Sequence, residues 1–298
     1  MTEKLLIVGG TGFIGTHLTK EALIRKFQVS ILSKKYIPIS QKIDGVEYLS
    51  ADVSVKSELL NQLNLRTFDH VINLSGYIDH SIYFKGGNKV IDVHFNGTKN
   101  LVDCLNHSDL RNFIQIGSSD EYGNNIAPQD ESLKEHFISP YSFAKAASTH
   151  FLQMLYMTES FPSIILRPFL LYGPGQSKER FIPQVIKGCI GGKKFPISKG
   201  KQLRDFCFIS DFVEAVFASL DNISAYGEVI NIASGKPISI EDMVKKIKDL
   251  VGFGKPEFGS LKYRSGENMA LYANISKANK LLNWSPVIEL NEGLLETI

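Results

Sequence analysis

A tyrosine and a lysine four residues apart, Tyr141 and Lys145, are the side chains of this sequence best suited to catalysis. The residues that follow, 146–156, have a helical pattern, and an i, i+4 spacing places both side chains on one helix face. An ammonium beside a phenol favours the phenolate, so we expect Lys145 to lower the pKa of Tyr141 from about 10. Such a tyrosine can exchange a proton with a hydroxyl or carbonyl group near neutral pH. A packed helix face without chemistry is the alternative interpretation.

A serine-rich turn lies upstream of this pair. The apolar run 113–116 predicts a strand, which leads directly into Gly117, Ser118 and Ser119. A hydroxyl at the carboxyl end of a parallel strand lies where doubly wound sheets bind their ligands. Ser118 can therefore bind the same substrate oxygen that Tyr141 serves. A loop or a helix N-cap is the alternative role for this serine.

A glycine-rich turn near the N-terminus is suited to binding phosphate. The apolar run 5–8 leads into the turn 9–15, of sequence GGTGFIG, and a predicted helix follows. Glycines in such a turn let the backbone approach a pyrophosphate, which the free N–H groups at the helix start can bind. A tight turn without a ligand is the alternative, but the strand–loop–helix context favours a dinucleotide. The expected cofactor contacts are Gly9, Gly12, Phe13, Ile14 and Gly15.

The residues after the second predicted strand bear on the choice of cofactor. NAD-binding proteins usually carry an acidic residue there, to bind the adenosine ribose. This chain has Ser33, Lys34 and Lys35, a hydroxyl and two positive charges that favour the 2′-phosphate of NADP(H). NAD(H) stays open, because lysines of a solvated loop are the ordinary alternative. Two residues after the third predicted strand are expected near the adenine: Asp52 and Val53.

These side chains need a scaffold that brings several strand ends together. Short apolar runs alternate with amphipathic segments, which predicts βαβ units around a parallel sheet. We expect an α/β protein with a Rossmann-type, doubly wound sheet. Residues 1–166 are expected to form the dinucleotide-binding domain, to which segments near 206–232 return. Residues 167–298 are expected to form mainly a smaller α/β domain that binds the substrate.

The composition argues against several classes of protein. A net charge of +2 over 298 residues gives no basic footprint for nucleic acid. No apolar run approaches the ~20 residues that span a bilayer, so we expect no membrane partner. Three widely spaced cysteines and seven scattered histidines show no metal-ligand spacing. We therefore expect no metal and a cytoplasmic location.

Together, these motifs resemble the extended short-chain dehydrogenase/reductase family, in its group of epimerases, dehydratases and reductases of nucleotide sugars. The resemblance covers nearly the whole chain, and it includes the segments 167–175 (RPFLLYGPG) and 204–211 (RDFCFISD). It implies that Ser118, rather than Ser119, acts in catalysis with Tyr141 and Lys145. It also implies that Tyr141 and Lys145 touch the cofactor, together with residues of the fourth strand end and the next helix: Leu74, Ser75, Gly76 and Asn96.

The resemblance further implies a nucleoside-diphosphate sugar as the substrate. In that family an arginine of the RDF motif grips the pyrophosphate, a role that falls here to Arg204. Arg264 and Glu267 resemble a second segment that contacts the nucleotide. The sugar pocket is expected to include Tyr77, Ser119 and Asp120. Family members are commonly homodimers, which implies contacts through helices at 96–106 and 141–160.

Three reactions of the family stay open on sequence alone. A 4,6-dehydratase carries an Asp-Glu pair where this chain has Ser119 and Asp120, although Asp120 could still act as a base. A 4-epimerase with tightly bound NAD usually has the ribose carboxylate that is missing here. We therefore expect reduction of the 4-keto group of a dTDP-, CDP- or GDP-linked 4-keto-6-deoxyhexose, in deoxysugar biosynthesis such as that of O-antigen. The epimerase and the dehydratase are the alternatives, followed by a non-catalytic cofactor-binding module.

Overall fold

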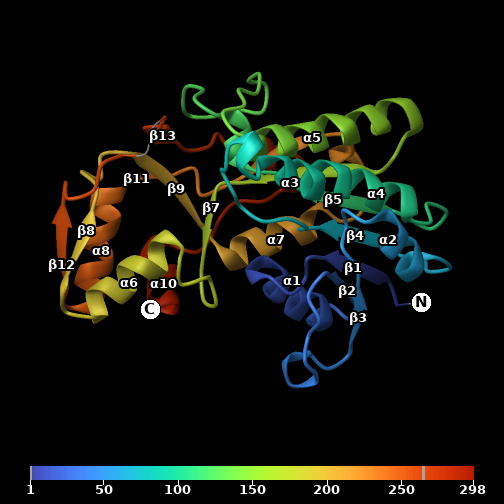
Figure 1. Ribbon diagram of the computed structural model, residues 1–298, viewed down its shortest axis with the longest axis horizontal. Coiled ribbons are helices and arrows are strands. Elements are labelled where there is room, and N and C mark those ends of the chain that lie inside the picture. The colour runs from blue at the N-terminus through green and yellow to red at the C-terminus, as the bar shows by residue number, and fades with distance from the viewer. Residues whose placement is uncertain (1, 264–265) are drawn as a thin grey trace.

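The computed structural model describes residues 2–263 and 266–298 (Figure 1). Its centre is a parallel sheet with the strand order β10-β6-β5-β4-β1-β2-β3. The connections run from β1 to β2 and β3 on one side, and then return to β4 on the other. The structure thus confirms the predicted α/β fold with a Rossmann-type sheet. The seven strands are β1 (Lys4–Val8), β2 (Gln28–Ser33), β3 (Val46–Ser50), β4 (His70–Asn73), β5 (Asn112–Ile116), β6 (Ser163–Pro168) and β10 (Val229–Ile232).

Helices cover both faces of this sheet, which explains why its strands are continuous apolar runs. In β1, Leu5 and Ile7 face a core that includes Leu18, whereas Leu6 and Val8 face a second core on the other side. The first face carries α1 (Phe13–Ile24) and α7 (Ile209–Ser219). The second carries α2 (Lys56–Leu63), α3 (Gly87–Ile91), α4 (Gly97–Cys104) and α5 (Pro140–Glu159), with a π-helical segment, η3 (Asp92–Asn96), between α3 and α4.

A smaller region lies beyond the carboxyl ends of these strands (Figure 1). It contains one sheet of β7 (Leu170–Tyr172), β9 (Leu203–Phe208), β11 (Pro237–Ser239) and β13 (Ala270–Leu271), and a second of β8 (Lys194–Ile197) and β12 (Lys255–Phe258). Its helices are α6 (Phe181–Ile190), α8 (Ile240–Val251) and α10 (Leu290–Thr297), while α9 (Ser276–Leu282) packs beside β10. Short helical turns are η1 (Ile39–Gln41), η2 (Tyr83–Lys85), η4 (Ser119–Tyr122) and η5 (Ile223–Ala225).

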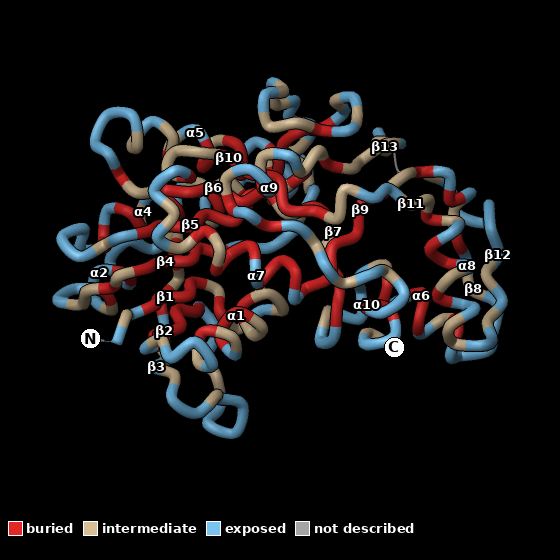
Figure 2. The backbone as a smooth tube through the Cα atoms, turned by 180° about the vertical axis from the view of Figure 1, so that it is seen from behind, coloured by how far each residue is buried: buried red, intermediate tan, exposed pale blue. Residues whose placement is uncertain are grey.

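The two regions share chain segments and buried surface. Figure 2 shows that buried backbone runs through the central strands and continues along β9 toward the smaller region. The segment that forms β10 follows β9 in the chain but completes the large sheet beside β6. The division of the chain into domains at residue 166 stays a prediction. Within the described residues, no helix combines the length and the apolar character needed to cross a membrane.

Candidate active site

The glycine loop joins β1 to α1 at the point where the strand order reverses. A Cβ added at Gly15 would lie 2.4 Å from the Cα of Gly10, and one added at Gly10 would lie 2.8 Å from the Ile31 side chain. The helix therefore approaches the sheet this closely only because both residues are glycines. In the part of the chain that the structure describes, no side chain caps the first turn of α1. This turn also contains no acidic residue. Its N–H groups, at Phe13 and Ile14, thus fit the pyrophosphate of a dinucleotide.

The predicted adenosine contacts lie at the ends of β2 and β3. The Ser33 hydroxyl lies 3.2 Å from that of Thr11 in the glycine loop, and it accepts the Lys35 N–H at 3.2 Å. The Lys34 ammonium lies 2.6 Å from the Asp52 carboxylate. This hydrogen bond raises the pKa of Lys34, and with Ser54 it lowers the pKa of Asp52 against the effect of burial. Two groups predicted to bind different parts of the cofactor are therefore bonded to each other.

The segment after β4 passes beside the glycine loop. A Cβ at Gly9 would lie 3.0 Å from the Leu74 carbonyl oxygen, so the two backbones are in close contact. The Ser75 hydroxyl donates to the Asn73 side chain at 2.6 Å. At Gly76, φ is +119°, and an added Cβ would lie 2.0 Å from the ring of His94. The structure thus brings Leu74, Ser75 and Gly76 to the predicted cofactor site, where their binding role stays a prediction.

The helical segment η3 carries Asn96, whose contact with the cofactor stays a prediction. Asn96 is exposed, and its amide donates to Asp92 at 3.0 Å. Val53 lies beneath the same segment, since a Cβ at Gly97 would be 2.8 Å from its side chain. The buried side chain of η3 is His94, which the sequence interpretation did not single out. An α-helical pattern gives no sign of this burial, because the segment has the period of a π-helix rather than that of an α-helix.

Ser118, Tyr141 and Lys145 meet at the carboxyl end of β5. Ser118 caps the turn η4: its hydroxyl accepts the Asp120 N–H at 3.1 Å. A capping box formed by Ser139 begins α5, so that Tyr141 and Lys145 occupy the first turns of this helix. Tyr141 is buried and hydrogen-bonded to Ser118. The Lys145 ammonium donates to the Ile116 carbonyl oxygen at 2.7 Å.

The electrostatics of the tyrosine differ from our expectation. Burial, together with the nearby charge of Asp120, raises the pKa of Tyr141, although the hydrogen bond with Ser118 acts in the opposite direction. Burial also lowers the pKa of Lys145 to about 8, against the attraction of Glu121. The predicted lowering of the Tyr141 pKa was wrong for this state, because the ammonium binds a backbone carbonyl while the phenol is desolvated beside a carboxylate. The environment of Tyr141 in this state therefore favours the protonated phenol.

The lowered pKa of Lys145 predicts how activity should depend on pH. The side chain is an ammonium below pH 8 and loses its charge above that value. We expect kcat/KM to fall above about pH 8, because the pH dependence of kcat/KM reports the ionisation of groups in the free enzyme. A pH series of initial rates measures this alkaline limb, which is the decline of kcat/KM at high pH. Lys89→Met, at an exposed lysine of α3, should leave the limb unchanged, and a profile flat to pH 10 would contradict the assignment.

A carboxylate and several basic side chains lie near Tyr141. The Asp120 carboxylate lies 3.8 Å from the His80 ring, and that ring meets the ring of Tyr141 edge-on at 5.6 Å between centroids. Burial raises the pKa of Asp120, and Glu121 adds to the effect, whereas His80, Arg180 and Arg204 oppose it. Asp120 is thus a carboxyl group with a raised pKa beside Tyr141. Arg180 was missed in the sequence, where it stands in a polar loop with no motif to mark it.

The predicted nucleotide contacts converge on the same side. The Arg204 guanidinium donates to the Glu267 carboxylate and, at 2.7 Å, to the Leu203 carbonyl oxygen. The neighbouring Asp205 is buried and accepts from the backbone of Ser234, at 2.7 Å, so its role is to hold a loop. Ser119 is buried in η4 and Tyr77 is half exposed, with its ring 6.1 Å from that of His94. Arg264, the remaining predicted contact, lies outside the described residues.

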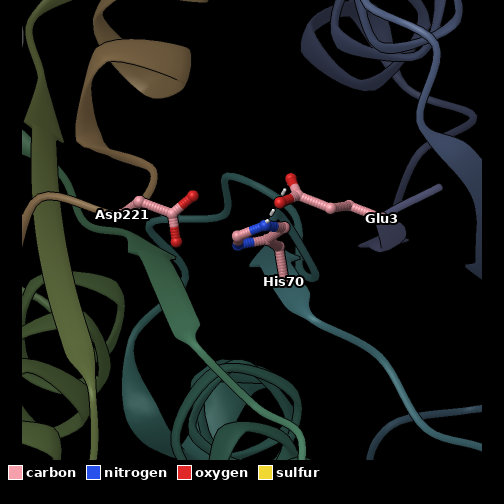
Figure 3. A group of neighbouring side chains, drawn as sticks. All are labelled: Glu3, His70 and Asp221. Carbon is pink, nitrogen blue, oxygen red and sulfur yellow. Dashed lines mark hydrogen bonds and ion pairs between the residues drawn. The ribbon is translucent and has the colours of Figure 1, made fainter. Parts of the chain in front are cut away.

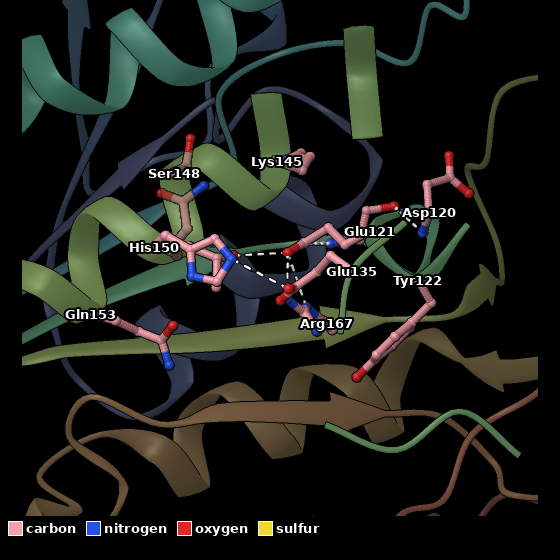
Figure 4. A network of polar contacts seen from close by, with 12 residues as sticks. Asp120, Glu121, Tyr122, Glu135, Lys145, Ser148, His150, Gln153 and Arg167 are labelled. Carbon is pink, nitrogen blue, oxygen red and sulfur yellow. Dashed lines mark hydrogen bonds and ion pairs between the residues drawn. The ribbon is translucent and has the colours of Figure 1, made fainter. Parts of the chain in front are cut away.

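A buried ionic network is hydrogen-bonded to the backbone of Ser118, and Figure 4 shows its members Glu121, Glu135 and Arg167. One Glu121 oxygen accepts the Ser118 N–H at 2.7 Å, and the other is bound by Thr149 of α5 at 2.9 Å and by Arg167 of β6 at 2.7 Å. Arg167 is 0% exposed, and it also binds Glu135 at 2.7 Å. We predicted no side-chain role for these residues, although a charged residue inside the apolar run of β6 was a signal of such a network. The network fixes Ser118 relative to the helix that carries Tyr141.

A second ionic group lies at the opposite edge of the sheet, where β1 and β4 begin (Figure 3). The buried His70 ring is 3.2 Å from the Glu3 carboxylate, and Asp221 lies within 4.8 Å of both. The Arg111 guanidinium pairs with Glu3 at 2.5 Å and with Asp221 at 2.7 Å. Because a cation of the chain already bridges both carboxylates, we assign this group to holding the strand ends together.

Known proteins are similar to this chain in sequence and in fold. A Bacillus subtilis (strain 168) protein named as an uncharacterised UDP-glucose epimerase, YtcB, is 29% identical over 309 residues, which cover 99% of this chain and 96% of that protein. A dTDP-D-glucose 4,6-dehydratase of Dictyostelium discoideum is 31% identical over 82% of this chain, which spans 61% of that longer protein.

One of the similar solved structures is a UDP-glucuronic acid 4-epimerase from Bacillus cereus in complex with UDP-glucuronic acid and NAD. It superposes with a TM-score of 0.87 at 28% identity and covers 98% of this chain and 97% of its own. The model of the NAD dependent epimerase/dehydratase family matches residues 5–233, from β1 to the end of the large sheet. This chain therefore belongs to the NAD dependent epimerase/dehydratase family, within the extended short-chain dehydrogenases/reductases.

Proposed function

We propose that this protein is an NADPH-dependent reductase of a nucleotide-linked 4-keto-6-deoxyhexose. The observation that carries the proposal is the environment of Tyr141, which is buried, bound to Ser118 and close to Asp120. This environment favours the protonated phenol. A reductase needs such a proton donor at the start of its reaction, whereas an enzyme that begins by oxidising an alcohol needs the phenolate as a base.

The side chains of the site supply the hydrogen bond and the proton that the reduction of a carbonyl group needs. The Ser118 hydroxyl donates a hydrogen bond to the carbonyl oxygen at C4 and polarises the bond. A nicotinamide cofactor bound beside the glycine loop would supply the hydride to the carbon. Tyr141 gives its proton to the oxygen as the alcohol forms, and the phenolate that remains is stabilised by the nearby Lys145 ammonium. One hydride and one proton are thereby added to the carbonyl group.

The end of β2 supports NADPH as the cofactor. The carboxylate that would bind the ribose hydroxyls of NAD is absent at Ser33, and Lys35 follows it in an exposed position. Lys34 contributes less than its charge suggests, because it is paired with Asp52. The Bacillus cereus relative holds NAD, so this part of the proposal rests on the residues of this chain.

A single substitution should reverse this cofactor preference. Ser33→Asp places a carboxylate where it binds a ribose hydroxyl and repels a 2′-phosphate, so the ratio of kcat/KM for NADPH over NADH should fall about 10–100-fold. The measurement is the initial rate with each cofactor at the same substrate concentration. Ser40→Asp adds the same charge at an exposed position of the same loop, and it should leave the ratio unchanged. An equal ratio in both variants would exclude Ser33 from the cofactor site.

The test of the proposed reaction is the loss of NADPH absorbance. Purified protein is mixed with NADPH, or with NADH, and with freshly generated dTDP-, CDP-, GDP- or UDP-linked 4-keto-6-deoxyhexose. We expect stoichiometric oxidation of NADPH with one of these sugars. No oxidation with any of them, together with NAD released when the protein is denatured, would overturn the reductase proposal.

The second candidate is a 4,6-dehydratase with bound NAD, which Asp120 favours. Burial raises the pKa of its carboxyl group, and the His80 ring at 3.8 Å can exchange a proton with it. Such a pair could remove a proton from a sugar carbon beside the oxidised C4. This candidate predicts water loss from an unmodified nucleotide-linked hexose without added cofactor. Asp120→Asn should then abolish turnover, whereas it should reduce the reductase activity by less than about tenfold.

A further inference from the structure

The end of the smaller region that lies farthest from the large sheet is formed by β8, β12 and the turns before them (Figure 1). One turn, 191–193, joins α6 to β8, and the other, 252–254, joins α8 to β12. The two strands are parallel and Lys194 lies opposite Lys255, so both turns are at the same end. A Cβ added at Gly254 would lie 2.9 Å from the backbone of α6. The two turns are therefore neighbours.

These turns and the residues beside them carry a concentrated positive charge. We call residues 187–194 and 248–255 the basic tip. It holds five lysines and one acidic residue, Asp249, which gives it a net charge of +4, whereas the whole chain carries +2. All five lysines are exposed, and among the described residues only one of them, Lys194, has an ion-pair partner, Glu257 at 2.6 Å. The lysines are Lys187, Lys193, Lys194, Lys248 and Lys255.

Two apolar side chains are exposed among these lysines. Phe253 is 52% exposed between two glycines, and Ile190 is 54% exposed at the last position of α6. A Cβ added at Gly192 or at Gly252 would meet no atom within 4 Å, so both turns project from the body of the smaller region. The basic tip therefore offers positive charge and apolar surface together, on a projecting end of the molecule.

We propose that the basic tip binds the surface of a membrane that contains anionic lipids. Its lysines lie among the negatively charged headgroups, while Phe253 and Ile190 enter the boundary between headgroups and acyl chains. Such a contact needs no spanning segment, so the expectation of no membrane partner, which rested on the lack of a spanning segment, does not bear on it. The inference is independent of the proposed reaction, because no residue of the basic tip belongs to the candidate active site.

A membrane surface fits the basic tip better than two other partners that carry negative charge. Individual phosphates of a nucleic acid are commonly gripped by arginine, whose guanidinium binds them at two points, and the basic tip has lysines but no arginine. A protein partner usually packs against apolar side chains gathered at the centre of an interface. Here Phe253 instead stands on a projecting turn. An anionic bilayer combines a diffuse negative surface with an accessible apolar interior, which matches both features.

The first measurement is co-sedimentation of the protein with vesicles of phosphatidylcholine, with or without about 30% phosphatidylglycerol. We expect binding to the anionic vesicles alone, and its loss when the salt concentration is raised from about 0.1 M to about 0.5 M. A triple variant that removes three lysines of the basic tip should bind about 10–100-fold more weakly, because each lysine near an anionic surface adds to the attraction. Its substitutions are Lys193→Gln, Lys248→Gln and Lys255→Gln.

A matched control removes the same charge from exposed lysines of α1, α3 and α9, outside the basic tip. Its substitutions are Lys20→Gln, Lys89→Gln and Lys280→Gln. This variant should bind the anionic vesicles like the wild type, and both triple variants should keep the melting temperature of the wild type. Equal binding by the wild type and the tip variant, or an equal loss in both triple variants, would overturn the proposal.

The second measurement reports whether the apolar side chain enters the bilayer. Phe253→Trp places a fluorophore on the projecting turn, and its emission should shift to shorter wavelength with the anionic vesicles but not with the neutral ones. Phe84→Trp, at a side chain of η2 that is 93% exposed, should show no shift. Trp284 is 5% exposed and contributes a constant background. An unchanged Phe253→Trp spectrum would overturn the proposed insertion.

The remaining outcomes concern the other partners. The wild type and the tip variant are also mixed with a short DNA duplex and with polyglutamate. Binding to either one that depends on the lysines of the basic tip, without binding to the anionic vesicles, would overturn the proposal in favour of a nucleic acid or an acidic protein. Binding to the anionic vesicles that the tip variant loses and the control variant keeps would establish the membrane contact.

Discussion

Replacing Tyr141 by phenylalanine should lower kcat by about 10²–10⁴-fold and leave the binding of NADPH nearly unchanged. Only one oxygen atom is removed from a side chain that is packed between His80 and His94, so the ring contacts stay in place. The lost hydroxyl is the proton donor in the proposed reaction, and it is the partner of Ser118. The measurements are the steady-state rate and the quenching of protein fluorescence by NADPH.

The control for this prediction lies in the same helix. Tyr156→Phe removes a hydroxyl from a half-buried tyrosine of α5 that packs against Gly227, away from the catalytic turn. It should retain the activity of the wild type. A Tyr141→Phe variant with more than a tenth of wild-type kcat would exclude this tyrosine as the acid, and the search would then move to Asp120, a neighbouring group with a raised pKa.

Replacing Arg167 by methionine should destabilise the fold by about 3–5 kcal/mol, because it leaves two carboxylates without their cation. Both the Arg167 and the Glu121 side chains are 0% exposed, so water cannot replace the lost partner. For a protein of this size we expect the melting temperature to fall by on the order of 10 °C. The measurement is thermal unfolding followed by circular dichroism.

Two further variants test the cause of that loss. Lys236→Met breaks an ion pair with Glu289 in which both side chains are 73% exposed, and it should leave the melting temperature almost unchanged. Adding Glu121→Gln to Arg167→Met should recover part of the stability, since the neutral amide no longer leaves a buried charge unpaired. A loss in Arg167→Met as small as that in Lys236→Met would show that the buried network contributes little.

The central sheet could be predicted from the sequence because its strands are short and apolar on both faces. Runs such as 5–8 and 113–116 became β1 and β5, and the glycines between β1 and α1 marked the close approach that the structure shows. The same reasoning located Ser118, Tyr141 and Arg204, because each stands in a motif with fixed spacing. Periodicity and local motifs were sufficient where a residue and its neighbours in the chain determine the contact.

The remaining features depend on contacts between distant segments. The pKa of Tyr141 is set by Asp120 and by burial, neither of which is visible in a four-residue spacing. The pairing of Lys34 with Asp52 joins two strand ends that are remote in the chain. It leaves both side chains less available to the cofactor than the sequence suggests. His94 and Arg167 make their contacts with rings and carboxylates on other elements. Sequence patterns give no measure of such contacts.

The position of β10 at the edge of the large sheet has a consequence for how the chain is synthesised. Because β6 pairs with β10, its outer edge stays without a partner until residue 232 has left the ribosome, more than sixty residues after β6 itself. During that interval the apolar strand 163–168 exposes unpaired backbone groups, which can pair with the strands of other chains. A chain truncated after residue 166 would keep this edge open permanently. The nascent protein should therefore depend on chaperones late in translation, although its cofactor loop emerges first.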